Sequence, residues 1–498
     1  MRKLLLYVVT GVVVVALCAV AFMYWFFSGD GLRRAIELQT TAFLGQPVKV
    51  GRARAGLLPR TAIHLSDVRI GEPARVTLAD VDVSTDFRGL LSRRIEDATI
   101  TIANSRVEMP LPFSIPSAGE SDGAASSSDA SSGVVEIVSI RTIALDDIVV
   151  ASRGREVRVS AESSLTGNRL MLRRFEARSG TTTLDAEGEV DLAPSVVAKL
   201  TAKANKLDVD ELLALADAFT PQPTGRTAAA PSAPMRIAAR VSAETATAGG
   251  VEVRQFASEL DVNGDRVVLS PLTFQLFGGR YQGAVSAQLG PTLSLTIKSR
   301  LQDLDVAQLA AFGGSPDTIS GTLTGAGTFS GSGADIAAVW KSARGMGTAT
   351  IADGAIRRLN LIRTVVLFFG RPAPETAEGT DHFDRIDASF SLANQILRAE
   401  PFSLRSRDAD IVGSFTLKLD SQTVDGMADL SLSEELSKQA GTDLIRFTRE
   451  GNRVVLPAHL GGTLAAPRLT IDAAAATKRG LRNEVERRLK GLLEGFGR

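Results

Sequence analysis

Few residues of this chain have the types and spacing that catalysis or metal binding requires. The three histidines, His64, His382 and His459, lie far apart, and Cys18 is the single cysteine. Zinc and iron–sulfur centres need several such ligands close together, so neither is expected. One cysteine also excludes an intrachain disulfide. The sequence therefore predicts no metal site.

The densest groups of titratable residues favour structural roles. Asp208, Asp210 and Glu211 fall at the start of a predicted helix over 207–216, where negative charge stabilises the helix dipole. The segment Asp381–Asp384, with His382 between two carboxylates, is expected to be a solvated turn. His64 and His459 stand in strand-like segments and are expected to be structural.

Nucleotide-binding and hydrolase motifs are missing. The chain has no G-x-x-x-x-G-K-[ST], and the glycine-rich run Gly321–Gly333 lacks G-x-G-x-x-G spacing, so hairpin bends are expected there. Ser332 does not satisfy G-x-S-x-G. Lys and Arg total 56 against 56 Asp and Glu, which argues against a nucleic-acid partner. We expect no catalytic residue, no cofactor and no enzymatic activity.

The remaining pattern is the alternation of aliphatic and polar residues, which is typical of half-buried strands. Residues 99–113 predict one such strand. In residues 76–83 the apolar positions change parity, which predicts a bulge or turn near Ala79–Asp80. Similar runs occur at 136–150, 156–160, 236–241, 293–297 and 387–392. The chain is therefore expected to be mainly β.

Two internal repeats support an elongated sheet of hairpins with occasional helices. LDVDELLALA at 207–216 resembles LDVAQLAAFG at 304–313. A glycine followed by alternating apolar residues recurs at Gly188, Gly283 and Gly413. Each glycine follows a strand that contains a phenylalanine, at 175, 274 and 402 respectively.

The N-terminus predicts a membrane anchor. Residues 4–27 contain no charge and, as a helix, would be about 36 Å long, enough to cross a hydrocarbon core of ~30 Å. Arg2 and Lys3 place the N-terminus in the cytoplasm, and residues 28–498 are then exported. A signal peptide cleaved after Ala19-Val20-Ala21 is the rival interpretation. The anchor residues are Leu4, Val12, Leu17, Trp25 and Phe27.

Composition divides the rest of the chain. Residues 114–133 are small and polar and predict a disordered linker, and residues 220–234 predict a Pro/Ala-rich extended linker. A helix is expected from Asp30 to Phe43. The expected segments are 1–27 (cytoplasmic stub and anchor), 28–113, 134–219, 235–345 and 346–475 (β regions), and 476–498 (amphipathic helix).

Two apolar segments have open interpretations. In 478–498, Leu481, Val485, Leu489, Leu492, Leu493 and Phe496 form one helical stripe. This helix either caps the end of the sheet or docks on a membrane surface or partner. Residues 361–369 are too short to span a bilayer and predict a buried capping helix, or else a lid or a patch for a partner.

The sequence resembles the AsmA family of Gram-negative envelope proteins. At the N-terminal side the resemblance covers LGQPVKVGRARAGLLPRTAIHLSDVRIGEPARVTLADVDVS and LLSRRIEDATITIANSRVEM. At the C-terminal side it covers GTATIADGAIRRLNL, FDRIDASFSLANQILRAEPFSLRSRDADIVGSFTLKLDSQTVDGMADLSL and LPAHLGGTLAAPRLTID. These regions make up roughly half of the chain, and their motifs are strand edges and turns.

The resemblance implies an inner-membrane anchor and a periplasmic, curved, antiparallel β-sheet groove that binds phospholipid and supports outer-membrane biogenesis. A wall of aliphatic side chains suits acyl chains, because neither carries an unmet hydrogen bond. An outer-membrane or periplasmic protein partner is also implied. The groove candidates are Val76, Leu78, Ile100, Ile102, Val190, Leu192, Val285, Leu295, Phe415 and Leu417.

Two questions stay open. The apolar faces can pack on one another as a sandwich instead of lining a groove, and the chain can serve as a scaffold or assembly factor that carries no lipid. About 25–30 strands at ~4.8 Å spacing would reach ~120–145 Å, so a bridge across the periplasm would depend on a partner or an oligomer.

Overall fold

A computed structural model describes residues 29–56, 61–85, 94–95, 97–111, 136–137, 139–219, 235–357, 364, 380–439, 448–450 and 452–496. The protein is mainly β, with 70% of residues in strands and few short helices, as expected. It divides into two compact units, residues 1–264 and 265–498, and the boundary falls inside the predicted 235–345 segment.

The sheet of the first unit begins with β1 (Val48–Gly56), β2 (Thr61–Ile70) and β3 (Val76–Thr85). β3 pairs with β5 (Ala98–Ala103) and β6 (Arg106–Met109), and both of these pair with β8 (Ser139–Ser152). The sheet continues in chain order through β9 (Arg155–Thr166), β10 (Arg169–Ser179), β11 (Thr182–Asp191), β12 (Val196–Asp208), β13 (Met235–Ala248) and β14 (Val251–Asn263). Short β4 (Arg94–Ile95) and β7 (Glu136–Ile137) pair separately.

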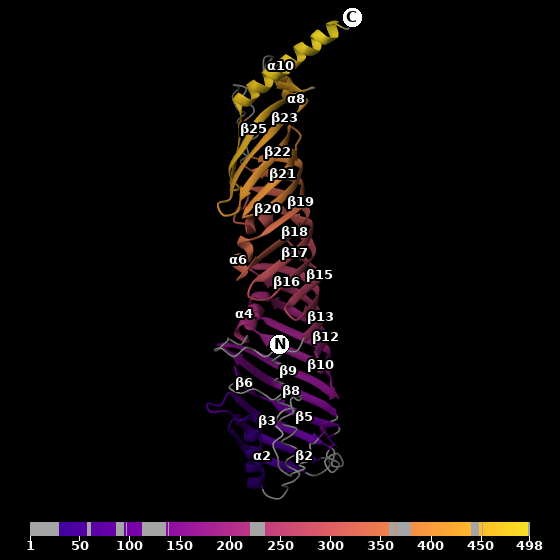
Figure 1. Cartoon of the computed structure of the whole chain (residues 1–498), viewed down its shortest axis with the longest axis vertical. Coiled ribbons are helices and arrows are strands. Elements are labelled where there is room, and N and C mark those ends of the chain that lie inside the picture. Colours follow the sequence, from indigo (N-terminus) through magenta and orange to yellow (C-terminus); the bar gives the residue numbers. More distant parts are fainter. Residues whose placement is uncertain are drawn as a thin grey trace, which may run out of the picture. The chain divides into compact units, whose positions relative to one another are not determined.

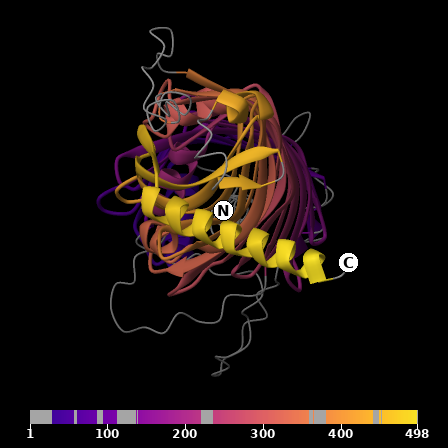
Figure 2. The ribbon, with the colours of Figure 1, turned by 90° about the horizontal axis from the view of Figure 1, so that it is seen from above.

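In the second unit each strand pairs with the next one along the chain. The strands are β15 (Arg266–Leu276), β16 (Gly279–Gln288), β17 (Leu293–Asp305), β18 (Ile319–Gly333), β19 (Arg344–Arg357), β20 (Thr380–Ala393), β21 (Ile396–Arg405), β22 (Ala409–Lys418) and β23 (Thr423–Leu432). β25 (Arg453–Thr463) joins β23, β26 (Ala466–Ile471) and short β24 (Arg449–Glu450). Within this unit the strands lie one above another and are bent (Figures 1 and 2).

The expectation of a purely antiparallel sheet was wrong, because the first unit is mixed. β12 and β13 run parallel, and β8 runs parallel to β5 and β6. Two neighbouring parallel strands need a crossover connection, which brings the chain back to the end of the sheet where the first strand began. The stretches of chain between these parallel strands, 110–138 and 209–234, include the two segments that composition marked as linkers, 114–133 and 220–234, both outside the described residues.

The change of parity predicted near Ala79–Asp80 is confirmed, but the bulge or turn expected there is wrong, because β3 runs unbroken from Val76 to Thr85 with no register shift against its neighbours. On β3 the buried positions change from Val76 to Val81 and Val83, and β2 changes parity between Leu65 and Val68. Asp67 and Asn104 adopt left-handed φ values of 57° and 49° at this level. The single strand expected over residues 99–113 is wrong, because the chain breaks at Asn104–Ser105 into β5 and β6.

The three repeated glycines mark a bulged hairpin. A register shift interrupts β10 beside Gly188, β15 beside Gly283 and β21 beside Gly413. A Cβ at these glycines would lie 2.1, 2.2 and 2.2 Å from a carbonyl oxygen of the next strand. Glycine is therefore required here because the following backbone occupies the space of a side chain.

The helices follow the sequence prediction in part. α2 (Gly29–Leu44), α4 (Val209–Phe219) and α5 (Val306–Phe312) lie at expected places, and α6 (Ile336–Lys341) and α8 (Glu434–Gln439) were not predicted. The 207–216 and 304–313 repeat is confirmed in detail, because Asp208 and Asp305 both accept a hydrogen bond from a backbone N–H of the first helical turn. The leucine that precedes each capping Asp, Leu207 or Leu304, is buried.

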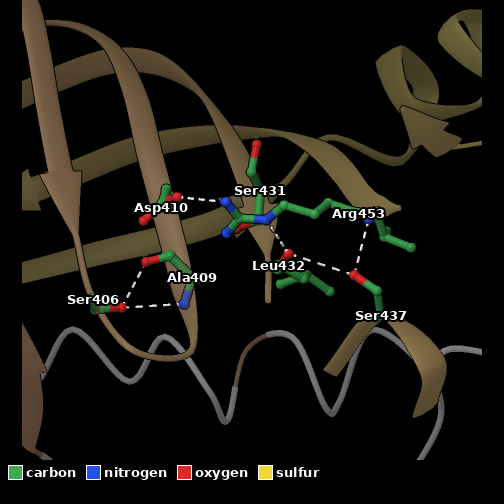
Figure 3. A network of polar contacts seen from close by, with 8 residues as sticks. Ser406, Ala409, Asp410, Ser431, Leu432, Ser437 and Arg453 are labelled. Carbon is green, nitrogen blue, oxygen red and sulfur yellow. Dashed lines mark hydrogen bonds and ion pairs between the residues drawn. The ribbon is translucent and has the colours of Figure 1, made fainter. Parts of the chain in front are cut away.

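A polar network closes the last strands of the second unit (Figure 3). The Arg453 guanidinium donates to Asp410 Oδ2 at 2.6 Å and to the carbonyls of Leu432 and Ser431 at 2.6 and 2.9 Å. The Ser437 hydroxyl accepts from the Val454 N–H at 2.9 Å. Arg453 on β25 thus connects to β22 and β23. The Ser437–Val454 hydrogen bond attaches α8 to the start of β25.

Several predictions fall on residues that the structure does not describe. They are the anchor residues Leu4, Val12, Leu17, Trp25 and Phe27, and the apolar segment 361–369 apart from Thr364. Within the part of the chain that is described, none of the helices is long and apolar enough to cross a bilayer.

Candidate functional site

The candidate site is the apolar face of the second unit, where cross-strand pairing aligns side chains into rows. One row follows the register through nine strands, from β15 to β23, with one residue from each strand. Its members are Leu269, Val285, Ile297, Phe329, Gly345, Leu392, Leu397, Leu417 and Val424. At ~4.8 Å per strand, this row is roughly 38 Å long.

A neighbouring row contains two aromatic rings, each of which pairs with a glycine on one side. Phe390 pairs with Gly347, and Phe415 pairs with Gly426. A Cβ at Gly347 would lie 2.7 Å from the Phe390 ring; in the long row, a Cβ at Gly345 would lie 2.4 Å from the Phe329 ring. The phenylalanine rings therefore occupy the space that a side chain at the paired glycines would fill.

Burial separates this face from the cores at the two ends of the chain. Two large clusters of buried hydrophobic side chains lie within residues 36–198 and within residues 383–471. On β16 to β18, residues of the long row such as Val285, Ile297 and Phe329 are only half-buried, whereas Leu304, Val306 and Leu323 form a separate small buried cluster. The described residues cover these side chains incompletely, so an apolar ligand could still reach them.

The ten predicted groove residues fall into two groups. Val76, Ile100, Ile102 and Val190 are buried in the first unit's core, and Leu78 and Leu192 pack half-buried against it. In the second unit, Val285 and Leu417 share the long row, while Leu295 and Phe415 lie in rows beside it; all four are half-buried.

The groove residues predicted from the sequence do not include several members of the long row, among them Ile297, Phe329, Leu392 and Leu397. Ile297 and Phe329 each lie between two polar residues, so extending the period-two pattern along β17 and β18 would have found them. Only the register shows that they are aligned with Val285 and Leu417.

The opposite face of the sheet carries the charge. In the second unit, Arg385 and Asp387 on β20 form an ion pair at 2.7 Å on this face. Hydrogen bonds from Arg385 and then from Thr350 hold the pKa of Asp387 below its ordinary value. The sheet is thus polar and solvated on one side and apolar on the other, as its alternation predicted.

A polar depression of about 570 Å³ on the first unit is a rival site. Its lining residues, from β5, β8, β9 and β10, include Arg158, Arg174 and Glu176. Arg158 lies 3.0 Å from Asp147, and Arg174 lies 2.9 Å from Glu176. Arg178 and then Arg174 lower the pKa of Glu176 by hydrogen bonding. These arginines already pair with carboxylates of the same face, which disfavours an anion site.

The titratable clusters have structural partners. Gly249 N–H donates to Asp210 at 2.8 Å, and Glu211 pairs with Arg155 and accepts from Ser179 at 3.1 Å. His382 lies on β20 and not in the turn that was expected. His64 contacts Asp82 at 2.5 Å on the exposed face of β2 and β3. Over the described ranges, His, Cys, Asp and Glu form no group that could hold a metal ion.

Comparison with known proteins gives no relative to reason from: no protein-family profile, curated protein or solved structure matches the chain. The candidate site therefore depends on geometry alone. The long row forms an apolar strip on one face of the sheet, and the opposite face is charged. Such a strip is suited to binding long aliphatic groups.

Proposed function

We propose that this chain binds phospholipid acyl chains on the apolar face of its β-sheet and supports lipid transport for outer-membrane biogenesis, as an inner-membrane-anchored periplasmic protein. The observation that carries the proposal is the row from Leu269 to Val424, which stays half-buried over most of its length. The resemblance of the sequence to the AsmA family agrees with it.

The dimensions of the row suit the ligand. Half of a ~30 Å hydrocarbon core is about 15 Å, which is the depth that one acyl chain occupies. A strip of roughly 38 Å therefore accommodates at least two chains end to end. Burial of an apolar chain contributes about 0.8 kcal/mol per CH₂, so even partial contact would hold a lipid.

The test is to secrete residues 28–498, purify them without detergent, and measure bound phospholipid by native mass spectrometry. We expect lipid on the wild type. Leu417→Glu, on the apolar face of β22, should reduce bound lipid by about tenfold, because it places a charge against the acyl chain. Val412→Glu is the matched control, since Val412 lies on the same strand with its side chain exposed on the opposite face.

A stable, lipid-free wild-type protein would contradict the proposal and favour the scaffold interpretation. Equal lipid loss in both variants would indicate a general effect of the added charge. A folded Leu417→Glu protein that retains its lipid would move the site away from this row.

A further inference from the structure

The first two turns of the terminal helix α10 (Ala473–Phe496) pack against the second unit. Asp472 caps it, accepting from the Ala475 N–H at 2.9 Å. Ala476 and Gly480 are buried. Arg479 donates to Asp429 at 2.6 Å and to Glu450 at 2.7 Å. These contacts fix the orientation of the helix, which extends past the end strands (Figures 1 and 2).

The three described members of the apolar stripe of α10 are exposed. Leu481, Val485 and Leu489 are 61%, 56% and 53% exposed. At ~100° per residue, these three positions lie about 180° around the helix from Ala476 and Gly480, which form the packed side. Leu492 and Phe496 continue the stripe by register. Of the two interpretations that the sequence left open, capping of the sheet is therefore wrong for Leu481, Val485 and Leu489.

The charge of the segment indicates what covers the stripe. Residues 478–498 contain seven Lys or Arg and three Glu. By helical register, Arg482 and Arg488 fall at the two margins of the stripe. An apolar stripe with basic residues at its margins and a polar remainder is typical of helices that lie in the interface of an anionic bilayer.

A second copy of the helix fits less well, because two segments of net positive charge would repel each other across the contact. We propose that α10 docks on the surface of an anionic phospholipid bilayer, with Leu481, Val485 and Leu489 inserted and the flanking arginines at the headgroups. This inference does not depend on acyl-chain binding by the sheet.

The experiment uses the full chain, held in phosphatidylcholine nanodiscs so that residues 4–27 are covered. Co-flotation is then measured with added vesicles of phosphatidylglycerol and phosphatidylcholine, and with vesicles of phosphatidylcholine alone. We expect flotation with the anionic vesicles, and about tenfold less for Leu481→Ser/Val485→Ser/Leu489→Ser. The matched control Leu213→Ser/Met346→Ser/Met427→Ser removes three comparably exposed apolar side chains elsewhere and should bind as the wild type does.

A second variant, Arg482→Gln/Arg488→Gln, keeps the stripe and should lose the preference for anionic vesicles; high salt should weaken wild-type binding in the same direction. Equal flotation of the wild type and the stripe variant would overturn the proposal. So would wild-type protein that does not float, or that self-associates without vesicles in a manner abolished by the stripe variant. Lipid bound at the sheet is measured separately, so the two proposals can fail independently.

Discussion

At the scale of single residues, the glycines of the bulged hairpins control how closely neighbouring strands approach. Gly283 faces the Lys298 carbonyl at a distance that excludes a Cβ, and the Tyr281 ring borders the same space. We expect Gly283→Ala to destabilise the second unit by about 2–4 kcal/mol, because the β17 backbone must move. Denaturant unfolding read by Trp340 fluorescence, in a Trp25→Phe background, measures this unit.

Gly290 provides the matched control for that substitution. It lies in the turn between β16 and β17, and a Cβ there would meet nothing closer than 4.0 Å. Gly290→Ala should change the unfolding free energy by about 0.5 kcal/mol or less. Similar destabilisation by both substitutions would show that close approach at the bulge is not the cause.

At the scale of elements, α5 depends on the charge of its capping residue. Asp305 accepts hydrogen bonds from the side chain and backbone N–H of Gln308 and from the Ala307 N–H. These bonds lower the pKa of Asp305, and the bond from the Gln308 side chain lowers it most. A lowered pKa means that the cap contributes stability above the ordinary Asp value of about 3.9, and that this contribution is lost as pH falls through the folded-state value.

We therefore expect Asp305→Ala to weaken α5 by about 1 kcal/mol at pH 7, and the difference from wild type to shrink at pH 3. Hydrogen exchange of the amides in 307–312 measures the helix directly. Asp265→Ala, in an exposed turn of the same unit, serves as the control. A difference that stays constant with pH would show that the carboxylate charge has no part in the cap.

The elements also show what a single sequence can predict. The two LDV repeats located α4 and α5, because a capping Asp after a strand is a local signal. Short α6 and α8 were missed, although Asp335 caps α6 in the same way, because six residues carry too little periodicity. The parallel pairing of β12 with β13 was missed because strand direction depends on where the connection runs.

At the scale of the whole molecule, alternation predicted a mainly β chain with one apolar face, but not how far that face is covered. Val190 and Val285 both follow a repeated glycine by two residues and look equivalent in sequence. The structure buries Val190 to 1% exposure within a large core and leaves Val285 half-buried. Burial depends on which other strands and helices pack over the face, and no local pattern encodes that.

If the chain binds lipid as proposed, the difference in burial between Val190 and Val285 predicts where the lipid contacts it. A photoreactive residue at Val285 or Ile297 should crosslink to labelled phospholipid, because these side chains remain accessible on the apolar face. The same residue at Met346, which is exposed on the opposite face, should not. At Val190 crosslinking should also be weak, since packed neighbours exclude an acyl chain. Strong crosslinking at Val190 in a folded protein would mean that the first unit opens its core to lipid, and crosslinking at Met346 equal to that at Val285 would contradict a one-sided lipid path.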